Sequence, residues 1–179
     1  MISRQSFASL IAAAGLLLAT AAHAQTATTS GAQSLHEADR TFITAGTQAV
    51  ATQRDAARLA DSRSTDRDVK AFAEKLVADE TSVSEALRAA SPRGVDVPRD
   101  NPDTAVLDRI RNLRGADFDK AYIQQVALAG QQKALSAFQA EIASGRDAQL
   151  KSAATKALPT IQADYARAQQ LAQRKHLTQ

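Results

Sequence analysis

The chain has no cysteine and no tryptophan, and its aromatic residues are limited to five phenylalanines and two tyrosines. The lack of cysteine excludes disulfides, a cysteine nucleophile and a lipid-modified cysteine. The lack of tryptophan and a formal net charge of only +3 argue against nucleic-acid binding, which needs stacking platforms and a strong positive field. A chain without disulfides must be held together by its hydrophobic core.

Residues 1–24 have the pattern of a secretory signal peptide. Arg4 forms a short basic region, residues 7–22 are apolar, and Ala22-His23-Ala24 is a small-x-small cleavage site. We therefore predict cleavage before Gln25 and a periplasmic or secreted mature protein, with an uncleaved membrane anchor as the alternative. The apolar run is too short for a stable membrane span. Cleavage removes one basic residue and no acidic one, which leaves a formal charge of +2.

The remaining sequence predicts an all-α fold with four long helices. Residues 25–33 are small and polar without periodicity, which is typical of a flexible linker, and residues 34–176 form the predicted bundle domain. Apolar residues at spacings of three and four predict helices over about 35–61, 66–90, 118–145 and 148–174. The expected N-caps are Ser34, Ser64 or Thr65, Asp117 and Asp147.

The connection between the second and third helices, residues 91–116, is long enough to contain a short helix of its own. Asn101-Pro102-Asp103 predicts the start of that helix, which reaches Gly115. A connection of this length can cross the whole bundle, as in ferritin-like folds, although a simple up-down order is the alternative. Pro159 is predicted to kink the fourth helix.

Two apolar stripes are interrupted by a carboxylate. Glu80 follows Leu76 in the stripe of the second helix, and Asp164 follows Ile161 in that of the fourth. A carboxylate inside a core stripe is costly unless it is paired, hydrated, protonated or bound to a cation. These two positions are therefore the best pointers to a site. The predicted core includes Phe42, Phe72, Leu76, Phe118, Phe138 and Ile161.

Five short segments resemble the exported bacterial domain-of-unknown-function 4142 family. They are ADRTF at 38–42, VKAFAEKLVAD at 69–79, GVDVP at 94–98, FDKAY at 118–122 and LP at 158–159. Their order and spacing extend the resemblance over about residues 36–173. The resemblance implies a ferritin-like four-helix bundle, and a loose association of the family with envelope stress suggests that setting for its function.

The resemblance also implies a polar centre made by four facing positions. Members of the family commonly carry Glu at the position of Gln53, and His at the positions of Glu80, Gly130 and Asp164. Glu and His at facing core positions are the ligand set of ferritin-like metal bundles. This chain departs from that set at all four positions.

Three interpretations of this centre stay open. The first is a vestigial polar centre that is hydrated or paired with a basic neighbour such as Lys133 or Arg167. The second is a site for a hard divalent cation, with the carboxylates of Glu80 and Asp164 and the carbonyl of Gln53 as oxygen ligands. The third is a small polar pocket that Gly130 enlarges, although this glycine can also simply permit close helix packing.

Other chemistry-bearing residues are less informative. The two histidines outside the predicted signal peptide, His36 and His176, are expected to be solvated, and the serines lack a nearby His–Asp pattern. Six arginines between positions 88 and 114 are interleaved with aspartates, which predicts a solvated surface, with a docking face for an acidic partner as the alternative.

We therefore expect an exported, non-catalytic helical bundle that binds an unidentified protein or small molecule and needs no cofactor. The alternative is a ferritin-like metal-binding protein with a divalent metal ion at its central carboxylates.

Overall fold

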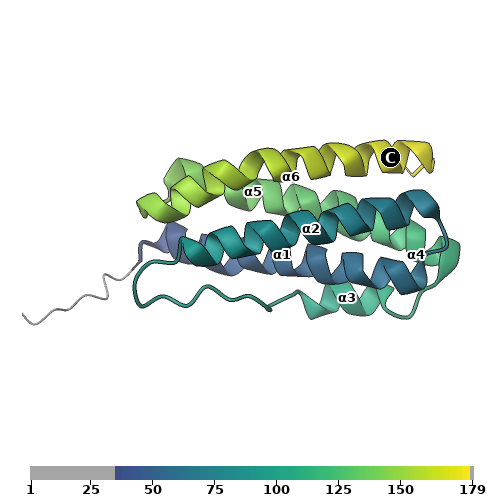
Figure 1. Ribbon diagram of the computed structural model, residues 1–179, viewed down its shortest axis with the longest axis horizontal. Helices are drawn as coiled ribbons and strands as arrows, with labels where there is room; N and C mark the ends of the chain where they lie inside the picture. Colours follow the sequence, from purple (N-terminus) through teal and green to yellow (C-terminus); the bar gives the residue numbers. More distant parts are fainter. Residues whose placement is uncertain (1–34, 178–179) are drawn as a thin grey trace, which may run out of the picture. The chain divides into compact units, whose positions relative to one another are not determined.

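The computed structural model describes residues 35–177, and within this range the chain is helical and has no strand (Figure 1). The predicted all-α class is confirmed. The predicted signal peptide and the linker lie outside the described residues. The helices are α1 Glu37–Arg63, α2 Arg67–Ala89, α3 Thr104–Ile110, α4 Gly115–Ala121, the π-helix η1 Tyr122–Leu128, α5 Ala129–Ser144 and α6 Ala148–Arg174.

Four long helical segments pack side by side, because α4, η1 and α5 follow one another without a break and together form the third segment. The π-helical turn inside this segment was not predicted from the sequence. A π-helix has i→i+5 hydrogen bonds and is rare, and π-helical turns inside α-helices are frequently found at functional sites. Here it faces α1 and α6 at the middle of the bundle.

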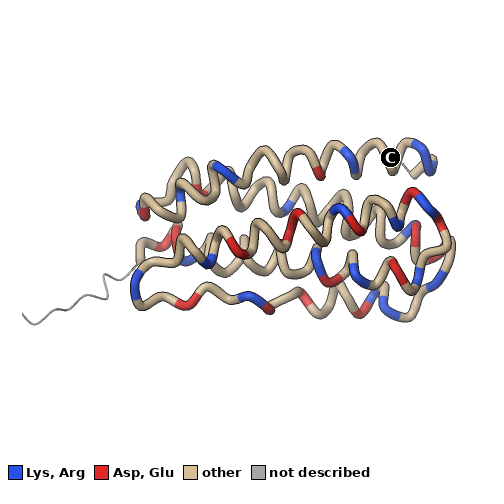
Figure 2. Tube along the Cα trace, viewed as in Figure 1, with Lys and Arg blue, Asp and Glu red and all other residues tan. Residues whose placement is uncertain are grey.

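The connection between α2 and α4 runs back along the bundle (Figure 1). Val97 packs with Phe42 near the beginning of α1, whereas Ile110 packs with Ala60 near its end. The third segment therefore runs in the same direction as α2, and α6 returns antiparallel to it. Lysine and arginine residues alternate with acidic residues along this connection (Figure 2).

A buried arginine ties the connection to α1. Arg54 is 3% exposed, and its guanidinium donates to the Asp100 carboxylate at 2.7 Å and to the Arg99 carbonyl at 3.3 Å. Next to it, the Asn101 side chain donates to the hydroxyl of Thr47 at 3.0 Å. These bonds explain why a long stretch without regular structure follows one path across the helix.

The predicted start of the second helix is wrong by one or two residues. Asp66 is the N-cap of α2, and its carboxylate accepts hydrogen bonds from the backbone N–H groups of Asp68 and Val69. The hydroxyl of Ser64 instead accepts from the Asp66 N–H at 3.0 Å. Ser64 therefore closes the turn between the two helices, which leaves the cap to the carboxylate.

Three further caps differ from the sequence prediction, and one agrees. His36 caps α1, Asp103 rather than Asn101 caps α3, and the third segment begins at Gly115, so that Asp117 lies in its first turn. Asn101 is not available as a cap because its side chain bonds α1. The predicted Asp147 cap of α6 is confirmed, with bonds from Gln149 N–H and Leu150 N–H. Pro159 lies inside α6 as predicted.

All six predicted core side chains are buried, with exposed fractions of 8% or less. Phe42 and Phe138 meet edge to face with ring centroids 5.0 Å apart, and Phe118 stacks on Tyr122 at 5.6 Å. The core residues form two apolar clusters, one at each end of the bundle. In the part of the chain that the structure describes, no helix is both long and apolar enough to cross a membrane.

Helix α1 is buried on more than one stripe. Phe42, Ala49 and Ala56 recur every seven residues on one stripe, and the structure buries these together with the neighbouring stripe that contains Ile43 and Val50. The reason is tertiary: α2, α5 and α3 all contact α1, so that only a narrow side of it faces solvent.

Candidate functional site

A polar layer separates the two apolar clusters at the middle of the bundle. Each long segment contributes to it: Gln53 from α1, Glu80 from α2, Gln131 from α5 and Asp164 from α6. All four side chains are 1% exposed or less. Along each segment, the buried apolar residues that precede the polar residue belong to one cluster, and those that follow it belong to the other. The interrupted stripes therefore come together as one layer.

Glu80 is held by a single neutral donor. Its Oε1 accepts a hydrogen bond from the Gln131 side-chain amide at 2.9 Å, while its Oε2 has no partner. Burial, together with the nearby charges of Asp164 and Asp79, raises the pKa of Glu80 to about 8, although the hydrogen bond from Gln131 acts in the opposite direction. Glu80 therefore carries a proton at neutral pH.

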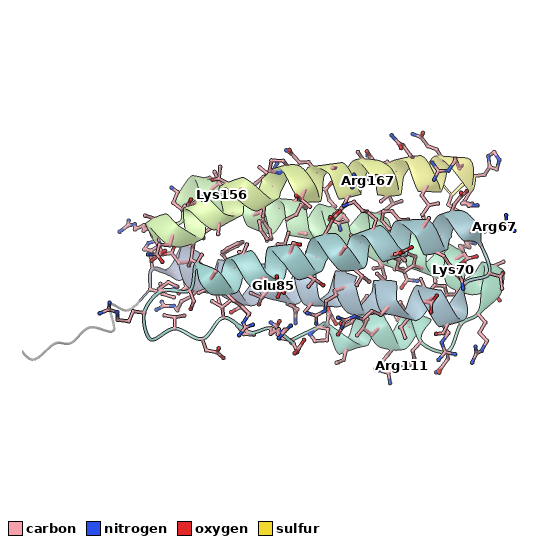
Figure 3. All side chains as sticks on the ribbon, viewed as in Figure 1. Arg67, Lys70, Glu85, Arg111, Lys156 and Arg167 are labelled. Carbon is pink, nitrogen blue, oxygen red and sulfur yellow. The ribbon has the colours of Figure 1, made fainter. Side chains whose placement is uncertain are left out.

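Asp164 has a cationic partner at the edge of the layer. The Arg167 guanidinium donates to Asp164 Oδ1 at 2.7 Å and lies 3.6 Å from an oxygen of Asp79 on α2. Arg167 lies between α6 and α2 (Figure 3). Burial and the charge of Asp79 nevertheless keep the pKa of Asp164 above its ordinary value, although Arg167 acts in the opposite direction. Of the two predicted basic neighbours, Arg167 pairs with the layer and Lys133 does not.

Gln53 and Gly130 fit one another. The Gln53 Nε2 donates to the Val126 carbonyl of η1 at 2.9 Å. A Cβ atom on Gly130 would collide with that same Nε2, and Gly130 therefore makes the room that the amide occupies. The bond to Val126 also fixes the orientation of the amide, because a flipped amide would set two carbonyl oxygens against each other. The Gln53 Oε1 is buried without a hydrogen-bond partner.

The layer also includes a phenol that the sequence analysis did not single out. Tyr122 is fully buried, and its hydroxyl has no hydrogen-bond partner. Burial raises its pKa, and the charges of Glu80 and Asp164 add to that rise. Its position four residues after Phe118 made it a core residue in the sequence, and nothing in the spacing indicated that its hydroxyl would face carboxylates.

The residues of this layer do not fit the predicted cation site well. Within residues 35–177, no three or more His, Cys, Asp or Glu side chains lie close enough together to hold one metal ion. Asp164 is already turned toward Arg167, and Glu80 toward Gln131. A divalent cation would have to draw most of its oxygen ligands from Glu80 Oε2, Asp164 Oδ2 and Gln53 Oε1, the buried atoms without partners.

A pocket of about 230 Å³ lies against the Gln53 side of the layer. Its lining comes from α1, the connection, α3, η1 and α5, and includes Gln53 and Gly130. The third interpretation of the centre, a polar pocket beside Gly130, corresponds to this space. The pocket lies beside the glycine rather than in the room that it leaves, because Gln53 fills that room.

The chain matches a known family over most of its length. Residues 24–171 match the domain of unknown function (DUF4142) family. The chain belongs to this family. The predicted resemblance is confirmed at that level, and the family description assigns no activity. No curated protein and no solved structure matches the chain.

A second buried acidic pair, at the end of the bundle where α1 begins, was missed by the sequence analysis. Asp39 and Glu141 are each 1% exposed. Asp39 Oδ1 accepts the backbone N–H groups of Arg146 at 2.8 Å and Asp147 at 3.0 Å. Burial alone would raise the pKa of Asp39, but these two donors lower it below its ordinary value.

Glu141 has no such donors. Burial and the charge of Asp39 together raise its pKa to about 7. Both carboxyl oxygens of Glu141 are buried without a hydrogen-bond partner. The opposite directions of the two pKa shifts indicate that Asp39 is the ionised member and that Glu141 is the one that holds a proton below about pH 7. This pair joins α1 and α5 to the turn before α6.

The other residues that the sequence analysis considered lie outside both acidic pairs. His36 and His176 are exposed, as expected, and His36 additionally accepts the Ala38 N–H as a helix cap. Lys133 is exposed and lines the pocket rather than the polar layer.

Proposed function

We propose that this protein is an exported, non-catalytic helical bundle that binds a small molecule at the middle of its length. The observation that carries the proposal is the pocket beside Gln53 and Gly130. It is a hollow between helices, lined by Gln53 and Gly130 of the polar layer and by the exposed Arg109 and Lys133. A concave site between helices with a few polar side chains in its lining is the usual form of a small-molecule site.

The setting of the proposal comes from the sequence and from the path of the chain. The signal-peptide pattern of residues 1–24 supports export, with a periplasmic or secreted mature chain that begins at Gln25. The crossover connection between α2 and α4 supports a ferritin-like arrangement of the four long segments. The loose family association with envelope stress is consistent with a binding protein in that compartment.

The alternative function is divalent-metal binding at the polar layer. It is favoured by one observation: Glu80 Oε2 and Asp164 Oδ2 are both buried and lack donors, and both carboxyl groups have raised pKa values. A cation between them would lower both pKa values. The competing guanidinium of Arg167 and the lack of a third acidic ligand make this the weaker of the two functions.

The deciding experiment uses the mature chain, purified without an affinity tag. Amide NMR shifts are followed while metabolite classes are added one at a time: amino acids, hydroxy acids, sugars and nucleosides. The proposal expects saturable shifts at Gly130 and Val126 with at least one class. Elemental analysis of the same sample tests the alternative, for which near-stoichiometric iron, manganese or zinc is expected.

A matched pair of variants shows whether the pocket is the binding site. Gln125 is exposed and lines the pocket, so Gln125→Trp fills it; Gln139 is exposed on α5 outside the pocket, so Gln139→Trp is the control. Binding should be lost in the first variant and kept in the second. Equal binding by both variants, or no saturable shift with any class, would refute the proposed function.

A further inference from the structure

Two exposed stripes, one on α5 and one on α6, contain no charged residue. The residues of each stripe recur at steps of four and three, which places them on one side of their helix. They are Gln132, Ser136, Gln139 and Ala143 on α5, and Gln162, Ala166, Gln169 and Gln173 on α6. We call these eight residues the α5–α6 face. In a chain with 23% charged residues, a face without charges differs from the rest of the surface.

The charged residues of the two helices that lie alongside this face are on other sides. Lys133 of α5 lines the pocket on the α1 side, and Glu141 is buried. Lys156 and Arg167 of α6 are about three turns apart and therefore share one side of that helix, where Arg167 lies 3.6 Å from Asp79 of α2 (Figure 3). Charged residues are frequent along α1, α2 and the connection (Figure 2).

A groove of about 510 Å³ shows that the two stripes adjoin. Gln132 of the first stripe and Gln169 and Gln173 of the second line it, together with Gln124 and Tyr165. None of the residues that line this groove is charged. The polar groups at its border are therefore amides and a phenol.

Apolar side chains lie near both ends of the face. Leu128 and Leu177 line the groove and pack on the apolar cluster at one end of the bundle. Ile142 and Leu158 pack on the cluster at the other end. All four are half-buried, so that each end of the face presents apolar surface beside the amides.

The chemistry of the face favours a partner that is also neutral. Electrostatic complementarity requires opposite charges, which these stripes do not offer to an acidic or a basic partner. An amide group both donates and accepts hydrogen bonds, so a glutamine stripe is complementary to another glutamine stripe. The central parts of protein interfaces are likewise depleted of charged residues. The face therefore fits a second copy of itself, as in the isologous interface of a two-fold dimer.

The face is also large enough for a dimer. The third segment extends about 30 Å between Gln124 and Ala143, and two adjacent helices are about 20 Å wide, which gives about 600 Å² in projection. The corrugated surface has a larger accessible area and approaches the roughly 800 Å² per partner of a stable interface. A small molecule in the groove would leave Ile142 and Leu158 uncovered, whereas a second copy covers both ends.

We propose that a second copy of this chain docks on the α5–α6 face and that the protein is a two-fold symmetric dimer. Amides of one copy hydrogen-bond amides of the other, and side chains of the partner fill the groove. This inference goes beyond the proposed function and does not depend on it, because the small-molecule pocket lies on the α1 side of α5.

Sedimentation equilibrium of the mature protein tests the dimer, for which twice the mass of one chain is expected. Gln132→Lys combined with Gln169→Lys places like charges in the interface and should weaken dimerisation at least about a hundredfold. The matched control is Ala78→Lys combined with Ser82→Lys, which adds the same charge to exposed positions of α2. The control should remain a dimer.

A rescue experiment separates loss of the interface from loss of the fold. Gln132→Glu combined with Gln169→Glu should also be monomeric by itself. Mixing this chain with the lysine variant should restore a dimer that contains one copy of each, because opposite charges then meet across the interface. Chains that failed to fold would not recover on mixing.

Three results would overturn the inference. One is a wild-type protein that stays monomeric at every accessible concentration. Another is a dimer that the lysine pair leaves intact, which would place the interface elsewhere. The third is a monomer whose Gln132 and Gln169 amide signals shift when neutral oligosaccharides are added, which would make the face a saccharide site instead.

Discussion

Asp39 and Glu80 are equally buried, at 1% exposed each, yet their pKa values move in opposite directions. Asp39 lies at the end of the bundle and faces two backbone N–H groups at the beginning of α6. Glu80 lies in the middle and faces one neutral side-chain amide. Low exposure by itself therefore does not determine the charge of a carboxyl group in this fold; its depth in the core and the number and kind of its donors do.

Each of these carboxyl groups has an acidic neighbour, Glu141 for Asp39 in the end pair and Asp164 for Glu80 in the middle pair, and these neighbours extend the comparison. Glu141 next to Asp39 has no donor and keeps a proton, so the end pair divides into one ionised and one neutral group. In the middle pair both pKa values are raised, and the guanidinium of Arg167 does not bring that of Asp164 down to its ordinary value, because Asp79 lies on the same side. Asp39 at the bundle end is therefore electrostatically satisfied, whereas Glu141 beside it and both carboxyl groups in the middle are not.

The largest expected effect is the pH dependence of stability. The folded-state pKa values of Glu80 and Glu141, about 8 and about 7, are raised from 4.5. The folded state therefore binds these protons more tightly than the unfolded state does. The stabilisation that the protonated Glu80 and Glu141 contribute is fully present below about pH 4.5, and it is lost as the pH rises through their folded-state pKa values of about 7 and about 8. We expect the unfolding free energy from urea titrations to fall by several kcal/mol between pH 5 and pH 8.

Asp39 cannot account for such a fall. Its folded-state pKa is lowered, so its contribution is present above its ordinary pKa of 3.8 and is lost only as the pH drops below that value. A stability that rises or stays level from pH 5 to pH 8 would show that the middle carboxyl groups are compensated by a cation or by water.

The next effect tests the satisfied end of the bundle. Asp39→Ala removes the acceptor of two N–H groups at the start of α6 and should destabilise the protein by about 2–3 kcal/mol at pH 7. Asp39→Asn keeps one acceptor oxygen and should cost less. The measurement is urea unfolding of both variants, and equal losses in the two would mean that the charge matters and the hydrogen bonds do not.

Glu80→Gln should have the opposite sign. The amide cannot ionise, so the variant avoids the free-energy cost of burying residue 80 at a pH where the carboxyl group of the unfolded chain is ionised. It should be more stable than wild type by about 1–3 kcal/mol at pH 8, with little difference at pH 4.5. Glu141→Gln should show the same gain at a slightly lower pH. Destabilisation by Glu80→Gln at pH 8 that disappears when a chelator is added would favour the metal alternative.

The smallest effect concerns the fit between Gly130 and Gln53. Gly130→Ala should displace the Gln53 amide from the Val126 carbonyl and destabilise the protein by about 1–2 kcal/mol. Because the two changes act on one contact, adding Gly130→Ala to Gln53→Ala should cost almost nothing more. Additive losses in this double-mutant cycle would show that Gly130 serves a packing role unrelated to Gln53.

The middle centre was predictable because of where its carboxylates stand in the stripes. Glu80 follows Leu76, and Asp164 follows Ile161, at the spacing of a core position. The same rule would have found the end pair: Glu141 follows Ala134 and Phe138 at steps of four and three, and Asp39 precedes Ile43 and Gly46 in the same way. The signal for the second centre was therefore present in the sequence.

The helix caps show where local rules reach their limit. Asp147 was correctly predicted as a cap, whereas Asn101 was not, because its side chain is drawn to Thr47 on α1. The π-helical turn had no sequence signal that we recognised, and its Val126 carbonyl is the one that Gln53 satisfies. Contacts of this kind join residues far apart in the chain, so spacing within one helix cannot anticipate them.

The sequence by itself determined the all-α class, the four long helical segments, the core aromatic residues and the positions where polar groups enter the core, because all of these follow from local periodicity. The tertiary structure decided which carboxyl groups keep a proton and which polar atoms are buried without a partner. Those outcomes depend on donors from distant parts of the chain, such as Gln131 for Glu80 and Arg146 for Asp39. Only the packing of the helices brings such donors within hydrogen-bond distance.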